Sequence, residues 1–194
     1  MSLLALIRHG ATDWNAERRL QGRADRPLSA AGRAAVKRWC PPALLGAAFW
    51  ATSPLTRARQ TAALLGRPDC AVEPVLVEMD WGGWEGRTRE ELIADTGIAA
   101  VDRNPLGRDF RPPGGESPRE VWGRLRPWIA AVARAGRPVA AITHRGVIRA
   151  LYSEATGWDM IGPPADDFTE GAAQLFLART DGSLGLIRAN LMLT

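Results

Sequence analysis

Long apolar segments are missing from this 194-residue chain. No apolar run reaches the roughly 18 residues that a membrane-spanning helix needs, so we expect no membrane partner. The first seven residues are mostly apolar, but the start lacks the positively charged leader and the small-residue cleavage site of a signal peptide. The sequence therefore predicts a cytoplasmic protein.

Cysteine is also scarce, with only Cys40 and Cys70 present. Their spacing matches neither a metal site nor a paired-cysteine redox motif, and reduced thiols are the expectation. No other cluster of residues has metal-ligand spacing. We therefore expect chemistry that needs neither a metal nor another cofactor.

Lysine is almost absent, because Lys37 is the only one among 25 basic residues. The net charge is +4, so arginine supplies nearly all of the positive charge. The rigid guanidinium fork suits phosphate, which favours an anionic ligand, although an arginine-rich solvated surface is the alternative. The arginines are interleaved with acids and form no basic run, so no nucleic-acid partner is expected.

Segments typical of strands alternate with segments typical of helices, which predicts an α/β fold. Strands are expected at residues 3–7, 48–52, 72–77 and 139–143, followed by a hairpin at 174–189. Helices are expected at about 29–39, 53–65, from 88 onward, 117–135 and 146–156. Pro127 should kink or break the fourth helix, and residues 104–117, rich in proline and glycine, should form a surface loop.

The only two histidines of the chain, His9 and His144, both follow predicted buried strands. Each stands beside an arginine and close to a glycine. Ligands of open α/β sheets bind beyond the carboxyl ends of the strands. The pattern therefore favours a functional site over the more common structural role of a histidine.

Five ordered blocks of sequence resemble the histidine phosphatase superfamily, which includes the cofactor-dependent phosphoglycerate mutases. The blocks are residues 7–32, 52–62, 78–86, 113–117 and 143–150. Arg-His-Gly alone would be a weak signal, but five blocks in the family's order span nearly the whole chain. The resemblance implies a phosphoglycerate mutase-like three-layer sandwich with a mainly parallel central sheet. We expect a single domain of residues 1–194, with a partly helical cap at about 80–136.

The resemblance also implies a reaction, the hydrolysis of a small-molecule phosphomonoester through a phosphohistidine. His9 would be the nucleophile, and His144 would contact an equatorial phosphoryl oxygen. Arg8 and Arg57 would bind the phosphoryl oxygens, since phosphoryl transfer needs fixed positive charge. Their charges should also favour neutral His9 by repelling its protonated form.

Three further residues are carried over from the family's motifs. Glu78 begins the third block, where the family has its general acid, and would protonate the leaving oxygen. Glu85 in the same block is interpreted as structural, tying down a loop. Asn15 and Gln21 are expected to bind substrate, with a helix cap for Asn15 and a loop-capping role for Gln21 as the alternatives.

One residue departs from the family pattern. Arg145 stands at the first of two positions where many phosphatases of this group have glycine, so it would either reach an anionic substrate or point away. Two other functions stay open: a phosphoglycerate mutase, and a catalytically inactive phospholigand-binding or regulatory domain. Mutases carry Arg-His-Tyr-Gly where this chain has residues 79–82, Met-Asp-Trp-Gly. Neither the substrate nor the oligomeric state follows from the sequence.

Overall fold

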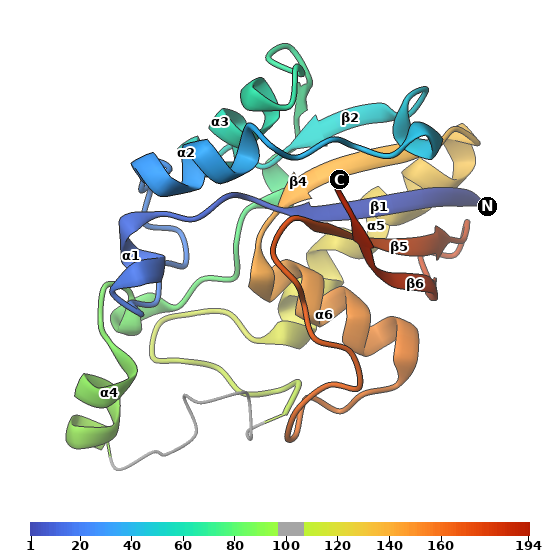
Figure 1. Cartoon of the computed structure of the whole chain (residues 1–194). Helices are drawn as coiled ribbons and strands as arrows, with labels where there is room; N and C mark the ends of the chain where they lie inside the picture. Colours follow the sequence, from blue (N-terminus) through green and yellow to red (C-terminus); the bar gives the residue numbers. More distant parts are fainter. Residues whose placement is uncertain (97–106) are drawn as a thin grey trace.

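A computed structural model describes residues 1–96 and 107–194. Six strands form one sheet in the order β3-β2-β4-β1-β5-β6 (Figure 1). The first four in this order pair in parallel, whereas β5 and β6 are antiparallel. The strands are β1 (Ser2–Arg8), β2 (Phe49–Thr52), β3 (Ala71–Val72), β4 (Val139–Thr143), β5 (Ala172–Ala178) and β6 (Leu184–Met192). The mainly parallel α/β sheet expected from the sequence is confirmed.

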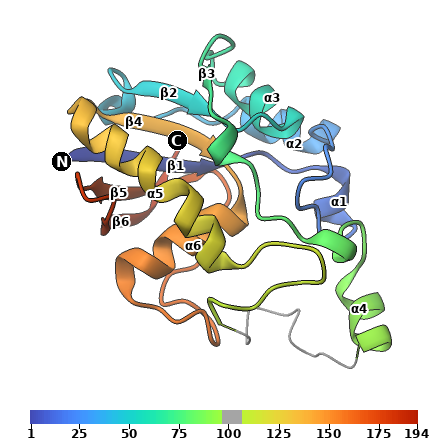
Figure 2. The ribbon, with the colours of Figure 1, turned by 180° about the vertical axis from the view of Figure 1, so that it is seen from behind.

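Helices cover both faces of this sheet (Figures 1 and 2). The α-helices are α1 (Asp13–Ala16), α2 (Ala30–Val36), α3 (Thr56–Leu64), α4 (Arg89–Thr96), α5 (Pro118–Ala135) and α6 (Arg145–Thr156). Short 3₁₀ turns occupy Ala43–Leu45, Pro74–Leu76 and Gly82–Trp84. Among the described residues, no helix is long and apolar enough to cross a membrane.

The central strand β1 faces a hydrophobic cluster on each side, which produces three layers. Leu4 and Leu6 pack with α5 and α6, whereas Ala5 and Ile7 pack with α3. Successive side chains of a strand point to opposite faces, so a strand buried on both sides is apolar throughout. This explains why residues 3–7 form an unbroken apolar run.

Polar side chains cap three of the helices close to the starts that the sequence predicts. Ser29 caps α2, and Ser117 forms a capping box at the start of α5. Thr88 exchanges hydrogen bonds with Glu91 at the start of α4. Pro127 was expected to kink or break this helix, and a break is wrong because α5 runs through Pro127. The helix buries an apolar face, which stabilises it despite the lost N–H.

Two predicted boundaries also differ from the structure. The strand expected at 72–77 ends at Val72, because Pro74 cannot donate a backbone hydrogen bond and begins a 3₁₀ turn instead. The helix expected from Ser53 begins at Thr56. The N–H of Ser53 instead donates to the carbonyl of Ile142 over 2.9 Å, which extends the pairing of β2 with β4.

The region assigned to a cap contains two different kinds of structure. α5 packs along the sheet and belongs to its core. α4 instead lies beyond the strand ends, on the same side as α1 (Figure 1). Residues 107–117 form irregular turns, as expected for the surface loop, while 97–106 lie outside the described residues. α5 is therefore not part of a cap. The rest of the domain organisation expected from the sequence remains a prediction.

Candidate active site

The two histidines meet at one edge of the sheet, because they follow neighbouring parallel strands. Arg8 at the end of β1 is paired with Thr143 at the end of β4. His9 and His144 are the next residues, and their ring centroids are 5.1 Å apart. The expectation that both lie beyond strand ends is confirmed by this register.

His9 is held through both of its ring nitrogens. Nδ1 lies 2.7 Å from the carbonyl oxygen of Gly10, and Nε2 lies 3.2 Å from Nε of Arg57. Since a carbonyl only accepts and an arginine N–H only donates, Nδ1 carries the proton and Nε2 the lone pair. Burial, followed by the charges of Arg8 and Arg57, holds the pKa of His9 well below its usual value.

Arg57 is fully buried near the start of α3. Its Nη2 donates to the carbonyl of Gly22 over 2.7 Å, and its Nη1 donates to that of Ala24 over 2.9 Å. Burial lowers the pKa of Arg57. Neutral carbonyls fix the guanidinium without neutralising it, so its charge is available to an anion.

Arg8 brings a second positive charge to the same edge. Its Nε is buried and has no hydrogen-bond partner among the described residues. Burial lowers its pKa, and the charge of Arg145 lowers it further. An unpartnered buried donor costs free energy that a bound anion would offset.

His144 is fully buried at the N-cap of α6, and its Nε2 lies 2.7 Å from Oγ of Ser53. Oγ also accepts the N–H of Leu55 over 3.3 Å, and because a hydroxyl can both donate and accept, its contact with Nε2 fits either ring tautomer. The Nδ1 of His144 has no partner within the described structure. Burial, then Arg57 and His9, hold the pKa of His144 well below its usual value.

Ser53 is a site residue that the sequence reasoning missed. It was interpreted only as the start of a helix, whereas it is fully buried and orients His144 from 91 residues away. Its place at the end of a predicted strand, like that of both histidines, was the signal that could have identified it.

Glu78 lies against the N-terminus of α6. Its Oε2 accepts the N–H of Gly146 at 3.0 Å, and its Oε1 accepts those of Met79 at 2.8 Å and Val147 at 3.2 Å. A Cβ atom at position 146 would lie 2.5 Å from Oε1. Gly146 is therefore the glycine that this site requires, and the neighbouring Arg145 is exposed.

Asn15 and Gln21 both contact Thr12. Oδ1 of Asn15 accepts the N–H of Thr12 over 2.9 Å in the capping box of α1, so the helix-cap interpretation is observed. Nε2 of Gln21 donates to Oγ1 of Thr12 over 2.6 Å, while its Oε1 is buried without a partner in the described part of the chain. Substrate binding by either residue stays a prediction.

Glu85 has the structural role expected for it. Its carboxylate accepts the N–H groups of Arg23 over 2.6 Å and Ala24 over 2.8 Å. These residues belong to the loop whose carbonyls hold Arg57. Gly22 in the same loop has φ of +51°, a conformation that favours glycine. Glu85 thus fixes the cradle of Arg57 rather than facing the histidines.

Metal ligands are not clustered at this edge. No group of three or more histidine, cysteine, aspartate or glutamate side chains within residues 1–96 and 107–194 could hold a metal ion. The positive charge of the site comes from arginine.

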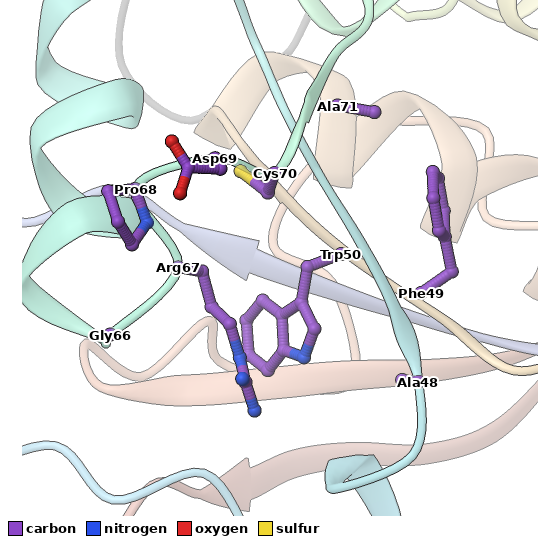
Figure 3. A pocket seen from close by; sticks show the side chains of 9 residues that line it. All are labelled: Ala48, Phe49, Trp50, Gly66, Arg67, Pro68, Asp69, Cys70 and Ala71. Carbon is purple, nitrogen blue, oxygen red and sulfur yellow. The ribbon is translucent and has the colours of Figure 1, made fainter.

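A separate hollow of about 350 Å³ lies at the other end of β2 (Figure 3). Arg67 lies over the ring of Trp50 there, 5.3 Å from its centroid. Burial raises the pKa of the nearby Cys70 thiol. The hollow lies at the N-terminal end of β2, whereas the histidines lie near its C-terminal end. The hollow is therefore separate from the candidate site.

The fold and the site together define a class of protein: an α/β protein with a buried, arginine-lined histidine pair at its strand ends. Residues 4–178 match the model of the histidine phosphatase superfamily (branch 1), and the chain belongs to this superfamily.

Named relatives fall into two groups. The chain is 34% identical over 169 residues to 2,3-bisphosphoglycerate-dependent phosphoglycerate mutase 2 of Gloeobacter violaceus, covering 79% of this chain and 75% of that one. It is also 34% identical over 168 residues to glucosyl-3-phosphoglycerate phosphatase of Mycobacterium tuberculosis, covering 76% and 72%. A solved structure of mycobacterial glucosyl-3-phosphoglycerate phosphatase with VO3 superposes with a TM-score of 0.81 at 28% identity, covering 98% of this chain and 100% of that one.

Proposed function

We propose that this protein hydrolyses a small-molecule phosphomonoester through a phosphohistidine on His9. The observation that carries the proposal is the state of the His9 ring. The ring is neutral, Nδ1 fixes its orientation, and the lone pair of Nε2 faces the positively charged Arg57. A neutral imidazole nitrogen is a competent nucleophile for phosphorus.

In the first step, Nε2 of His9 attacks phosphorus and the bond to the ester oxygen breaks. The entering phosphoryl group replaces the 3.2 Å hydrogen bond between Nε2 and Arg57, whose donors then turn to the phosphoryl oxygens. Arg8 and, in its Nδ1–H tautomer, His144 supply further donors, since both have atoms without partners in the described structure. Positive groups aimed at the phosphoryl oxygens stabilise the charge of the transition state.

Glu78 provides the proton for the departing oxygen, which leaves as an alcohol. Its two carboxylate oxygens accept three backbone N–H groups, and free lone pairs remain for a proton. In the second step, the same carboxylate takes a proton from water as the water oxygen attacks the phosphohistidine. Inorganic phosphate forms and neutral His9 returns, so the atoms and charges balance over the cycle.

The relatives support this reaction class in two ways. The mycobacterial phosphatase is named for a phosphate ester, and its structure with VO3 contains an anion that resembles a phosphoryl group in transfer. We therefore expect vanadate to inhibit this protein competitively with its phosphate ester.

A mutase is the second candidate, because several relatives are named as phosphoglycerate mutases. Both reactions share the phosphohistidine and differ in what accepts the phosphoryl group. Supplying a phosphate ester together with excess phosphoglycerate, and measuring free phosphate against transferred phosphoryl, separates them. A phosphatase should release mostly free phosphate, and a mutase should transfer most of the phosphoryl group to phosphoglycerate.

The test of the proposal is His9→Ala, measured for phosphate release over a panel of phosphomonoesters and for folding by circular dichroism. We expect turnover to disappear while the fold is retained. Alkaline quenching after mixing with radiolabelled ester should trap label on the wild-type chain and none on the variant. Activity within about tenfold of wild type, ~1.4 kcal/mol in barrier, would rule out His9 as the nucleophile.

A further inference from the structure

The backbone of Gly10 holds the imidazole of His9 in place. Its carbonyl oxygen lies 2.7 Å from Nδ1 of His9, and its N–H donates to Oγ1 of Thr61 over 3.0 Å. A Cβ atom at position 10 would lie 2.4 Å from Cγ2 of Val36 on α2. Gly10 is thus packed against α2 and hydrogen-bonded to α3, so a shift of its backbone would move the acceptor that orients the His9 ring.

Thr61 lies on α3 and is fully buried. Its Oγ1 donates to the carbonyl of Arg57, one helical turn earlier, over 2.8 Å. Because the hydroxyl proton is used in this bond, the lone pairs of the oxygen are available to the N–H of Gly10. The same hydroxyl therefore contacts the residue that follows His9 and the residue whose guanidinium faces His9.

These contacts form a closed ring of hydrogen bonds that begins at one nitrogen of the imidazole and ends at the other. Nδ1 of His9 bonds to Gly10, and Gly10 bonds to Thr61. Thr61 bonds to Arg57, and Nε of Arg57 donates to Nε2 of His9 over 3.2 Å. One buried hydroxyl, which bonds to two backbone groups, therefore links both sides of the imidazole.

A hydroxyl that bonds to the carbonyl four residues earlier is common in helices and often has only a local role. Thr156 on α6 is such a case, because its Oγ1 donates to the carbonyl of Tyr152 over 2.8 Å and accepts the N–H of Trp158 over 3.3 Å. All three residues belong to one continuous segment. Thr61 makes the same pair of bonds, but the N–H that it accepts lies 51 residues away, beside His9. Thr61 therefore joins two segments of the site.

We propose that Thr61 is a positioning residue for His9, which holds the Gly10 carbonyl and the Arg57 backbone at the separation that keeps the Nε2 lone pair available. Without the hydroxyl, the N–H of Gly10 is left unpaired, and its backbone should move toward another acceptor. The proton on Nδ1 is then less strongly fixed, because the tautomer of a histidine is set by its hydrogen-bond partners. The effect on the ring follows from the geometry, whereas the effect on the rate rests on the proposed function.

Thr61→Val tests the effect on the ring, since valine keeps the branched shape and removes both hydrogen bonds. Nitrogen-15 NMR of the imidazoles at pH 8 shows which ring nitrogen carries the proton, and the spectrum of His144→Gln assigns the two histidines. In the wild-type protein the proton of His9 should be on Nδ1. Thr61→Val should give a mixture of the two tautomers, and Thr61→Ser, which keeps the hydroxyl, should restore the wild-type spectrum.

The same variants are compared for phosphate release. The kcat of Thr61→Val should fall by about 10- to 100-fold, the scale expected when a reacting group is displaced by up to ~1 Å. KM should change less, because backbone carbonyls at residues 22 and 24 still hold the guanidinium of Arg57. Thr61→Ser should recover most of kcat. Thr156→Val is the matched control, since it deletes the same pair of bonds on α6 and should leave the His9 signals and kcat unchanged.

A purely structural role for Thr61 gives a different pattern. The melting temperature of Thr61→Val should fall under either role, so the tautomer of His9 is the deciding measurement. The wild-type tautomer in a less stable Thr61→Val would overturn the proposal, whether or not kcat falls. If Thr61→Val does not fold, Thr61→Cys takes its place, because a thiol is a weaker donor and acceptor than a hydroxyl. Mixed tautomers in that variant support the proposal, and the wild-type tautomer overturns it.

Failure of the proposed function is distinguishable, because the ring measurement needs no substrate. If the wild-type protein releases no phosphate from any phosphomonoester tested, the phosphatase proposal fails. A tautomer of His9 that changes in Thr61→Val but not in Thr156→Val would still support the positioning role. A wild-type His9 that carries its proton on Nε2 would overturn that role.

Discussion

Arg57 donates a hydrogen bond from Nε to Nε2 of His9 over 3.2 Å, while Nδ1 of the same ring is bound by the carbonyl of Gly10 at 2.7 Å. An Nε2–H would point at the N–H of Arg57, so the contact disfavours protonated His9. The free protein therefore holds the ring neutral and in position before a phosphate arrives. In the proposed reaction, phosphorus would replace the guanidinium as the partner of Nε2.

The first prediction concerns protonation of the two histidines. Both pKa values are held well below the unfolded value of about 6.5 by burial and by nearby arginines. Because the chain has only two histidines, the Cε1–H resonances are simple to assign in a pH titration by NMR. Neither should titrate near pH 6.5 in the folded protein, whereas both should do so in urea. A folded-state midpoint at 6.5 or above for His9 would contradict the geometry.

The same shifts determine how stability depends on pH. Below about pH 6.5 the unfolded chain binds protons at His9 and His144 that the folded chain does not. The free energy of unfolding should therefore fall as the pH is lowered from 7 toward the folded pKa values. Urea midpoints at pH 7 and 5 measure this, and His144→Gln should show a shallower decline than wild type.

A second prediction concerns the residue that orients His144. Ser53→Ala removes the hydroxyl 2.7 Å from Nε2, so the ring loses the hydrogen bond that holds its orientation. We expect kcat/KM to fall by about tenfold or more, together with a loss of about 1–3 kcal/mol in stability from the unpaired group. Thr52→Val is the control, because it deletes the adjacent buried hydroxyl, whose hydrogen bond in the described structure goes to the carbonyl of Ser53 at 3.3 Å. Equal activity of the two variants would show that Ser53 has no role in orienting His144.

A third prediction separates the carboxylates by leaving group. An alkyl phosphate needs an acid, whereas a nitrophenyl phosphate needs it much less because its leaving oxygen is already stable. Glu78→Gln should therefore slow the alkyl ester by about 10²–10⁴ and the aryl ester far less. Glu85→Gln should slow both equally, since its contacts are with the backbone of residues 23 and 24.

Rate-limiting hydrolysis of the phosphohistidine would mask this difference, so the comparison needs single-turnover measurements. Phosphorylation of His9 by an alkyl ester should be slow in Glu78→Gln and retained in Glu85→Gln. The opposite result would transfer the acid role to Glu85. Loss of the three backbone contacts of Glu78 is expected to slow both esters alike, which distinguishes structural damage from proton transfer.

A fourth prediction concerns metals. Arg8 and Arg57 supply the positive charge that a divalent ion provides in other phosphoryl-transfer sites. We expect phosphate release to survive exhaustive dialysis against a chelator. Loss of activity on chelation, with recovery after a divalent ion is added, would overturn the metal-independent mechanism.

The sequence alone was sufficient for the order of the elements and for the histidine pair. Apolar runs ending beside glycine predict buried strands, and such local patterns need no tertiary information. They located β1, β2 and β4, the starts of α2 and α5, and the placement of His9 and His144 beyond strand ends. The family motifs added Arg8, Arg57 and Glu78. In the structure Arg8 ends β1, Arg57 contacts His9, and Glu78 contacts the N-terminus of α6.

Tertiary structure decided the contacts that join distant segments. Ser53 contacts His144 across 91 residues, and Glu78 contacts Gly146 across 68, because strand register places these segments side by side. The ring proton of each histidine depends on such partners. Sequence patterns report the burial of a face, but the partner of a polar atom is set by how the elements pack.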